Sequence, residues 1–204
     1  MRVMSDFAPS FPRDLRPEIE QLRPRIGKLT KSAGAGFGVL VGTEYLAVPY
    51  RVYGPILPDA RPIGSTARTV ISCILSRHAD GRVRERNLRH LLEQTEAWTG
   101  PFVLRLLGEY VVEITELVAH AVAQPGDSAA ARRSLYREVL EANPGFTRRL
   151  RSQSVSYWNA YYRDSYPSVH DYPATRALDV ILGESRSISL SHARGGGNGG
   201  RCDL

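Results

Sequence analysis

Residues 99–123, TGPFVLRLLGEYVVEITELVAHAVA, form the longest uninterrupted helical pattern in the sequence. Placed on a helix, the charged residues of this stretch fall within an arc of roughly 80°, and most of the remaining positions are apolar. An apolar arc of this width must be covered by neighbouring elements on most sides. We therefore expect one long central helix over 99–123 at the core of the fold. Its charged members are Arg105, Glu109, Glu113, Glu116 and His120.

The same charges argue against a membrane span, because glutamate and arginine are costly inside a bilayer. The N-terminus, MRVMSDFAPSFPRDL, also lacks the apolar segment of a signal peptide. Two cysteines, Cys73 and Cys202, are too few for a disulfide framework or a cysteine-based zinc site. We expect a soluble, cytoplasmic protein without a membrane partner.

Helical patterns on both sides of the central stretch predict a mainly α fold of about six helices in a single bundle. The flanking helices are expected over 64–80, 80–92, 128–141, 146–166 and 173–182. A small β-hairpin is expected over 37–48, because Gly42-Thr43 separates two runs rich in β-branched and aromatic residues.

The domain boundaries follow from composition. Residues 1–36 are polar and rich in proline, and predict a flexible N-terminal arm with one short helix over 14–23 that Pro24 would end. Residues 37–183 predict the helical domain. Residues 184–204 are rich in glycine and serine and predict a disordered tail, because they hold too few apolar side chains to offset the entropy of ordering.

The chain is basic, and nearly all of its basic residues are arginine. The formal net charge is +6, and among 27 basic residues only Lys28 and Lys31 are lysine. Arginine suits bidentate contacts with phosphate and carboxylate groups. GC-rich coding also favours arginine over lysine without functional selection, so the composition favours anionic partners in general and does not define a site.

Residues 76–92, SRHADGRVRERNLRHLL, admit three interpretations. A calcium-binding EF-hand loop would have Asp80 as its single carboxylate and Asn87 in place of the bidentate glutamate, which is too little negative charge. A helix-turn-helix would present the basic residues after Asp80-Gly81 to nucleic acid. The third interpretation, a plain antiparallel helix pair, is favoured. Its Asp-Gly-x-Val-Arg turn resembles the paired-helix units of HEAT-type repeats, in a single copy.

Two arginine-rich helices, 82–89 and 148–163, are candidate surfaces for nucleic acid or another partner. The second also carries tyrosines and a tryptophan, and aromatic rings stack on bases while guanidinium groups hold phosphates. An ordinary solvated helix face explains the same pattern and is the simpler interpretation. The candidate residues are Arg82, Arg84, Arg86, Asn87, Arg89, Arg148, Arg149 and Arg163.

The acidic stripe of the central helix is the remaining candidate site. Glu109, Glu113, Glu116 and His120 follow one another at spacings of 4, 3 and 4 residues, which places them on one helix face. Such a face could bind a metal or perform acid–base chemistry, but no second helix supplies matching acids for a di-iron site. A solvated stripe with an Arg105–Glu109 pair is favoured. Between a solvated stripe and a metal or acid–base site lies an intermediate possibility, in which the glutamates are partly buried and pair with arginines of the arginine-rich helices.

The sequence lacks the motifs of nucleophilic catalysis and of dinucleotide or P-loop phosphate binding. We therefore expect no metal and no cofactor, and a noncatalytic protein-binding or scaffold module with a protein partner. Nucleic-acid binding through 82–89 and 148–163 is the first alternative. A metal-dependent enzyme that uses the acidic stripe is the second.

Overall fold

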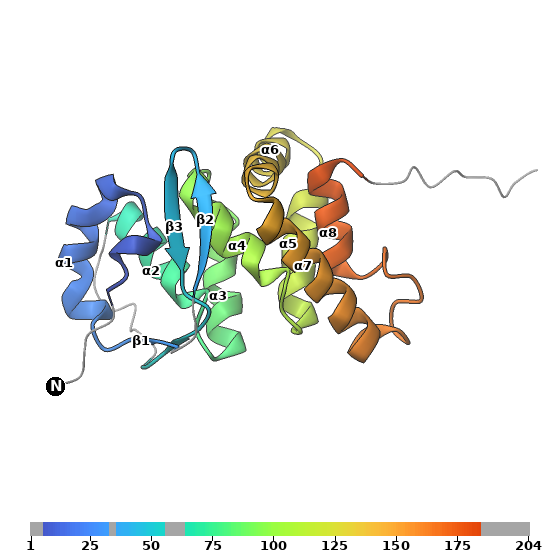
Figure 1. Ribbon diagram of the computed structural model, residues 1–204, viewed down its shortest axis with the longest axis horizontal. Helices are drawn as coiled ribbons and strands as arrows, with labels where there is room; N and C mark the ends of the chain where they lie inside the picture. The colour runs from blue at the N-terminus through green and yellow to red at the C-terminus, as the bar shows by residue number, and fades with distance from the viewer. Residues whose placement is uncertain (1–5, 33–35, 56–63, 185–204) are drawn as a thin grey trace, which may run out of the picture.

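The computed structural model describes residues 6–32, 36–55 and 64–184. Within these ranges the fold is mainly helical, as the sequence predicted (Figure 1). It also has two small two-stranded sheets, of which the sequence predicted one, the hairpin over 37–48. There are eight α-helices here; the sequence predicted about six in the bundle and a short one over 14–23. They are α1 (Arg16–Ile26), α2 (Ser65–Leu75), α3 (Gly81–Leu91), α4 (Gly100–Leu106), α5 (Val112–Ala123), α6 (Asp127–Ala142), α7 (Pro144–Tyr157) and α8 (Pro173–Leu182).

The expected central helix over 99–123 is divided into α4 and α5 by a turn at residues 107–111. The backbone N–H groups of Leu107 and Gly108 bond to carbonyl oxygens three residues back, which tightens the end of α4. Val111 is then extended, with φ −79° and ψ 103°. An added Cβ at Gly108 would lie 2.5 Å from Arg105 Nη1, so a larger residue there would displace the end of that side chain. The apolar pattern of 99–123 is therefore shared by two helices that meet at this turn.

The expected hairpin is confirmed as β2 (Phe37–Val41) paired antiparallel with β3 (Glu44–Val48). Its two-residue turn needs a left-handed conformation, which Gly42 supplies with φ 58°. The hairpin lies between two helical parts of the chain, since β3 contacts the 3-10 helix η1 (Ala8–Ser10) and β2 contacts α6 (Figure 1).

At the outer edge of β2, the backbone of Leu40 is bonded to one side chain from the other half of the chain. The Leu40 N–H donates to Asn143 Oδ1 at 2.8 Å, and Asn143 Nδ2 donates to the Leu40 carbonyl at 2.8 Å. The carboxamide thus supplies the donor and the acceptor that a neighbouring strand would offer. Asn143 also precedes α7, so it joins the hairpin to the α6–α7 corner.

The N-terminal segment differs from the flexible arm that its composition suggested. α1 continues through Pro24 to Ile26, and residues 6–32 contribute six large apolar side chains to the core. Burial of these side chains stabilises the segment against the helical body. They are Phe7, Phe11, Ile19, Leu22, Ile26 and Leu29.

The segment after the hairpin connects the sheet region to the α2–α3 turn. β4 (Val52–Tyr53) pairs with β1 (Thr30–Lys31), and Val52 also exchanges backbone hydrogen bonds with Arg77 and Ala79. α3 begins as predicted at Asp80-Gly81, where the Asp80 side chain accepts from the Arg82 N–H at 2.8 Å. This arrangement brings residues 50–53 against the turn at residues 76–80.

The C-terminal half packs α8 against α5 and α7. α7 begins at Pro144 and passes at Trp158 into a π-helical turn, Trp158–Tyr162, so the predicted helix over 146–166 starts earlier and ends sooner. α8 ends as predicted at Gly183, which is left-handed with φ 72°. Of the predicted tail, residues 185–204 lie outside the described residues.

Replacing Asn143 with alanine is expected to destabilise the fold by about 1–3 kcal/mol, because the Leu40 backbone groups lose both partners at a half-buried edge. Urea unfolding followed by circular dichroism measures this change. Asn87→Ala is the matched control, since the Asn87 amide donates to the Val83 carbonyl within its own helix. Equal destabilisation by the two variants would contradict the role given to Asn143.

Candidate functional site

The most unusual group in the structure is the carboxylate of Glu109, which lies in the turn between α4 and α5 with its side chain 1% exposed. Its Oε1 accepts a hydrogen bond from Arg51 Nη1 at 2.5 Å and lies 3.1 Å from Arg77 Nη1. Its Oε2 lies 2.8 Å from Arg84 Nε. One carboxylate therefore holds three guanidinium groups.

Each of the two most buried arginines is also fixed by hydrogen bonds to backbone carbonyls. Arg77 ends the α2 segment and donates to the carbonyl oxygens of Pro49 and Tyr50. Arg84 lies in the first turn of α3 and donates from Nη1 to the carbonyls of His78 and Ala79. The guanidinium groups thus tie the extended segment and the α2–α3 turn to the turn that carries Glu109.

A fourth guanidinium, from Arg105 at the end of α4, completes what we call the arginine cluster: Arg51, Arg77, Arg84 and Arg105 around Glu109. Arg105 donates to the Gly108 carbonyl at 3.0 Å and to Gln153 Oε1 at 3.1 Å. It also lies over the rings of Phe37 and Tyr50. The expected Arg105–Glu109 pair is replaced by these contacts, and Glu109 pairs with the other three arginines.

Burial and charge act in opposite directions inside the cluster. Burial raises the pKa of the Glu109 carboxyl, but attraction by Arg77, Arg51 and Arg84 outweighs it and leaves that pKa below 4.5. The pKa of Arg77 is lowered to about 9, mainly by burial; attraction by Glu109 opposes the decrease, and repulsion by Arg105 and Arg51 adds to it. Both groups are therefore ionised at neutral pH, and the cluster carries an excess of positive charge.

Exposed tyrosines lie next to the cluster. Arg51 and Arg105 both contact the Tyr50 ring, with guanidinium carbons 5.6 Å and 5.4 Å from its centre. Tyr110 follows Glu109 directly, and its ring centre lies 6.2 Å from that of Tyr157 on α7. Tyr157 in turn lies 6.4 Å from Tyr161. Tyr50, Tyr110, Tyr157 and Tyr161 are named the tyrosine surface below.

Three tyrosines of the tyrosine surface are well exposed, and hydrogen bonds and ring stacking hold the residues behind them in place. Exposure is 43% for Tyr50, 55% for Tyr110 and 69% for Tyr161. Behind them Tyr162 donates from its hydroxyl to the Tyr110 carbonyl at 2.6 Å and stacks on buried Tyr172. Tyr161 belongs to the π-helical turn, a form that is rare in proteins and frequent at functional sites.

The acidic stripe is not one solvated face. Glu109 is buried in the arginine cluster, which matches the intermediate possibility of pairing with an arginine-rich helix through Arg84. Glu113, Glu116 and His120 are exposed on α5, where Glu116 accepts from the Tyr166 hydroxyl at 2.9 Å. The structure therefore does not bring the four side chains together as a common metal or acid–base site.

Other metal-binding patterns also lack a counterpart in the described part of the chain. Across residues 6–32, 36–55 and 64–184, histidine, cysteine and carboxylate side chains do not gather in groups of three or more suited to a metal ion. In the segment weighed as a calcium loop, Asp80 caps α3 and the His78 ring accepts from the Asp80 N–H. That segment forms the helix pair favoured from the sequence.

Six of the eight candidate residues on the two arginine-rich helices are exposed, and Arg84 and Asn87 are the exceptions. Arg84 is buried in the arginine cluster, and Asn87 donates within α3 to the Val83 carbonyl. Arg89 is paired with Glu85 at 2.7 Å, and Arg163 bonds to Asn159 and lies over Trp158. The exposed members are Arg82, Arg86, Arg89, Arg148, Arg149 and Arg163.

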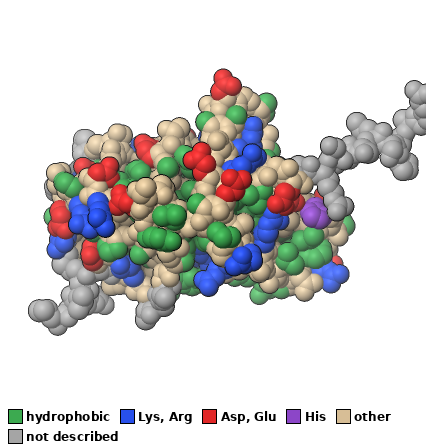
Figure 2. All heavy atoms as spheres, turned by 45° about the horizontal axis from the view of Figure 1, so that its top comes forward, with side chains coloured by type: hydrophobic (Ala, Val, Ile, Leu, Met, Phe, Trp, Pro, Cys, Tyr) green, Lys and Arg blue, Asp and Glu red, His purple; other side chains and the backbone are tan. Residues whose placement is uncertain are grey.

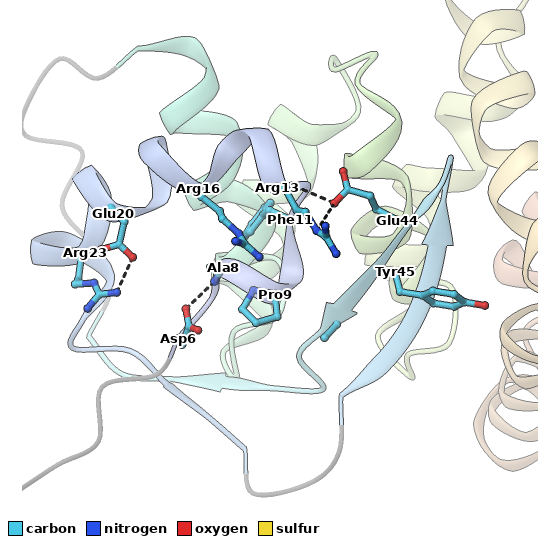
Figure 3. A pocket seen from close by; sticks show the side chains of 11 residues that line it. Asp6, Ala8, Pro9, Phe11, Arg13, Arg16, Glu20, Arg23, Glu44 and Tyr45 are labelled. Atoms are coloured by element: carbon cyan, nitrogen blue, oxygen red, sulfur yellow. Dashed lines mark hydrogen bonds and ion pairs between the residues drawn. The ribbon is translucent and has the colours of Figure 1, made fainter.

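A surface hollow of about 520 Å³ lies between the N-terminal segment and β3 (Figure 3). Arg13 and Glu44 form one ion pair along it, at 3.7 Å, and Arg23 and Glu20 form another, at 2.6 Å. Its lining holds three arginines and three acidic residues. Because the positive and negative charges are equal in number, the hollow attracts a charged partner less strongly than the arginine cluster does.

Sequence reasoning missed Arg51 and Arg77 as functional candidates. They come from an extended segment and a turn, and no short motif links either of them to Glu109. The one available signal was Arg77 itself, because it lies within the predicted helix over 64–80, just after its apolar residues, and must be paired if that part of the helix is buried.

Glu109→Gln is expected to lower the free energy of unfolding at pH 7 by about 3–5 kcal/mol, because buried guanidinium groups lose their shared carboxylate. The folded-state pKa of Glu109 is below its usual value, so this contribution is complete above pH 4.5 and is lost as pH falls through the lowered pKa. Urea unfolding of the native protein and of Glu109→Gln, from pH 7 into the acid range, measures their free energies of unfolding. The difference between these two free energies should become smaller as the pH falls.

The control is Glu113→Gln, which removes the same charge from an exposed site on α5 and should change stability by less than about 0.5 kcal/mol. The native protein and Glu109→Gln should not differ by a constant free energy of unfolding through the acid range. A constant difference would contradict the buried pairing.

Within the described ranges, no helix combines the length and the apolar character needed to cross a membrane. No protein-family model matches the chain, and neither curated proteins nor solved structures show a significant similarity to it. Function is therefore inferred from the arrangement of the side chains alone.

Proposed function

We propose that the protein is a noncatalytic binding module that docks a partner protein on the tyrosine surface. The observation that carries this proposal is the exposure of Tyr50, Tyr110 and Tyr161 beside a buried cluster of arginines. Exposed aromatic rings that lie together on a protein surface mark interaction sites more often than scattered apolar residues do.

The chemistry of the surface supports a protein partner. Tyrosine and arginine are among the residues that contribute most to binding energy at interfaces. Tyrosine offers a large contact area with only two rotatable side-chain bonds, so little entropy is lost when it is ordered. Here the Tyr110 backbone is held by Tyr162, and Tyr50 lies against two guanidinium groups. The surface is thus ordered before a partner arrives, which favours affinity.

A photo-cross-linking amino acid at position 161 or 110, in cells that produce the protein, is expected to capture the same partner. With the purified pair, Tyr161→Ala and Tyr110→Ala should each weaken binding by about 2 kcal/mol, or roughly thirtyfold in Kd, by isothermal titration calorimetry. The matched control is Tyr45→Ala, because Tyr45 is 76% exposed on β3 and lies outside the tyrosine surface.

Two results would contradict the proposal. One is capture of the same proteins from position 45 as from positions 110 and 161. The other is a decrease in binding of equal size in Tyr45→Ala and Tyr161→Ala.

Nucleic-acid binding is the second candidate, and one observation favours it. Exposed Arg148, Arg149 and Arg163 lie on the same helical segment as Tyr157 and Tyr161, a combination that suits phosphate contacts and base stacking. Basic and acidic side chains are interspersed on the face drawn in Figure 2, so that face is not a uniform phosphate-binding surface. A protein partner is therefore the first proposal.

The nucleic-acid alternative predicts binding to mixed-sequence single-stranded RNA at about 50 mM salt, weakening as salt is raised. The double variant Arg148→Gln and Arg149→Gln should reduce the slope of log affinity against log salt by about 0.7 for each phosphate that the protein no longer neutralises. Fluorescence anisotropy with labelled RNA measures both effects. Arg23→Gln serves as control, since Arg23 is paired with Glu20 on α1, outside both candidate helices. An absence of binding at low salt would end this alternative.

A further inference from the structure

The arginine cluster has fewer negative than positive groups within the described part of the chain. The ion pairs of Arg51, Arg77 and Arg84 all share the single carboxylate of Glu109. Arg105 is satisfied by two neutral oxygens, from Gly108 and Gln153. Four guanidinium groups therefore surround one carboxylate in a setting that is largely removed from water, where an additional anion would be strongly attracted.

Arg51 is the member of the cluster that such an anion can reach. Its side chain is 17% exposed, whereas the side chains of Arg77 and Arg84 are 0% and 2% exposed. Arg51 Nη1 is bonded to Glu109, and its guanidinium group lies against the ring of Tyr50, which is itself part of the tyrosine surface. An anion next to the Tyr50 ring would thus contact the Arg51 guanidinium group directly. It would also lie near Arg105, whose guanidinium group lies against the same ring.

Resting on the proposed function, we propose that Arg51 binds a carboxylate side chain of the partner, so that the partner segment on the tyrosine surface is acidic. A planar carboxylate matches the planar guanidinium group and can accept two hydrogen bonds from it. The Tyr50 ring against the Arg51 guanidinium group covers one face of this contact and removes part of it from water, which strengthens it. Arg105, whose guanidinium group also lies against the Tyr50 ring, adds a second positive charge near the carboxylate.

The cluster also explains why the contact would be selective. Burial lowers the pKa of Arg105, and the nearby charge of Arg51 lowers it further while Glu109 opposes the decrease. A second carboxylate relieves this repulsion between like charges, whereas a neutral amide of the same shape does not. Discrimination between glutamate and glutamine in the partner is the direct consequence.

The test uses the full chain and two labelled peptides, (Glu-Gly)5 and (Gln-Gly)5, with binding measured by fluorescence anisotropy. The glutamate peptide should bind and the glutamine peptide should not. Arg51→Gln should weaken binding of the glutamate peptide about tenfold, because it removes one charge-assisted hydrogen-bonding group. Arg51→Lys, which keeps the charge without the planar fork, should give an intermediate decrease.

The matched control is Arg86→Gln, which removes the same charge from an exposed position on α3 and should change binding by less than about twofold. Equal decreases in Arg51→Gln and Arg86→Gln would overturn the inference in favour of general charge attraction. Inorganic phosphate forms a second arm. Displacement of the peptide by phosphate at an equal concentration would overturn it in favour of a site for free oxyanions.

The outcome can be separated from that of the proposed function. If cross-linking from position 161 still captures the partner with unchanged affinity in Arg51→Gln, the docking surface stands and the acidic contact fails. If neither Tyr161→Ala nor Arg51→Gln affects the partner, both proposals fail. Cooperative thermal unfolding of Arg51→Gln and Arg51→Lys confirms that the weaker binding does not reflect unfolding.

Discussion

The carboxylate of Glu109 is the group on which the surrounding structure depends. It joins an extended segment, the α2–α3 turn and the α4–α5 turn through three guanidinium groups at 2.5–3.1 Å. Burying one charge of either sign without a partner is costly, so none of these segments can move alone. The turn that divides the apolar 25-residue pattern into two helices is also the turn that carries Glu109.

The tyrosine surface takes its order from this cluster. Tyr110 follows Glu109 in the chain, and Tyr50 precedes Arg51, so the backbones of both tyrosines are fixed by ionic contacts one residue away. Their rings remain free to contact a partner. A rigid backbone beneath exposed rings is the arrangement expected of a docking surface, because less entropy is lost on association.

The sequence predicted the features that depend on neighbouring residues. The mainly helical fold, the hairpin at Gly42-Thr43, the Asp80 cap and the end of α8 at Gly183 all follow from local signals. The turn at residues 107–111 could not be predicted in this way, since its apolar pattern continues without a break and the partners of Glu109, such as Arg51, lie as far as 58 positions away. The candidate site shares this difficulty, and of the residues whose charges meet there only Arg84, Arg105 and Glu109 were singled out beforehand.

The Asn143 bridge to Leu40 has a consequence for the order of events during synthesis. These residues are 103 positions apart, so β2 emerges from the ribosome long before the side chain that bonds to its edge. Until Asn143 follows, the nascent hairpin presents an unpaired strand edge that can join another chain. The first half of the protein is therefore most exposed to misassembly while the second half is being made, and slow translation between these positions would extend that interval.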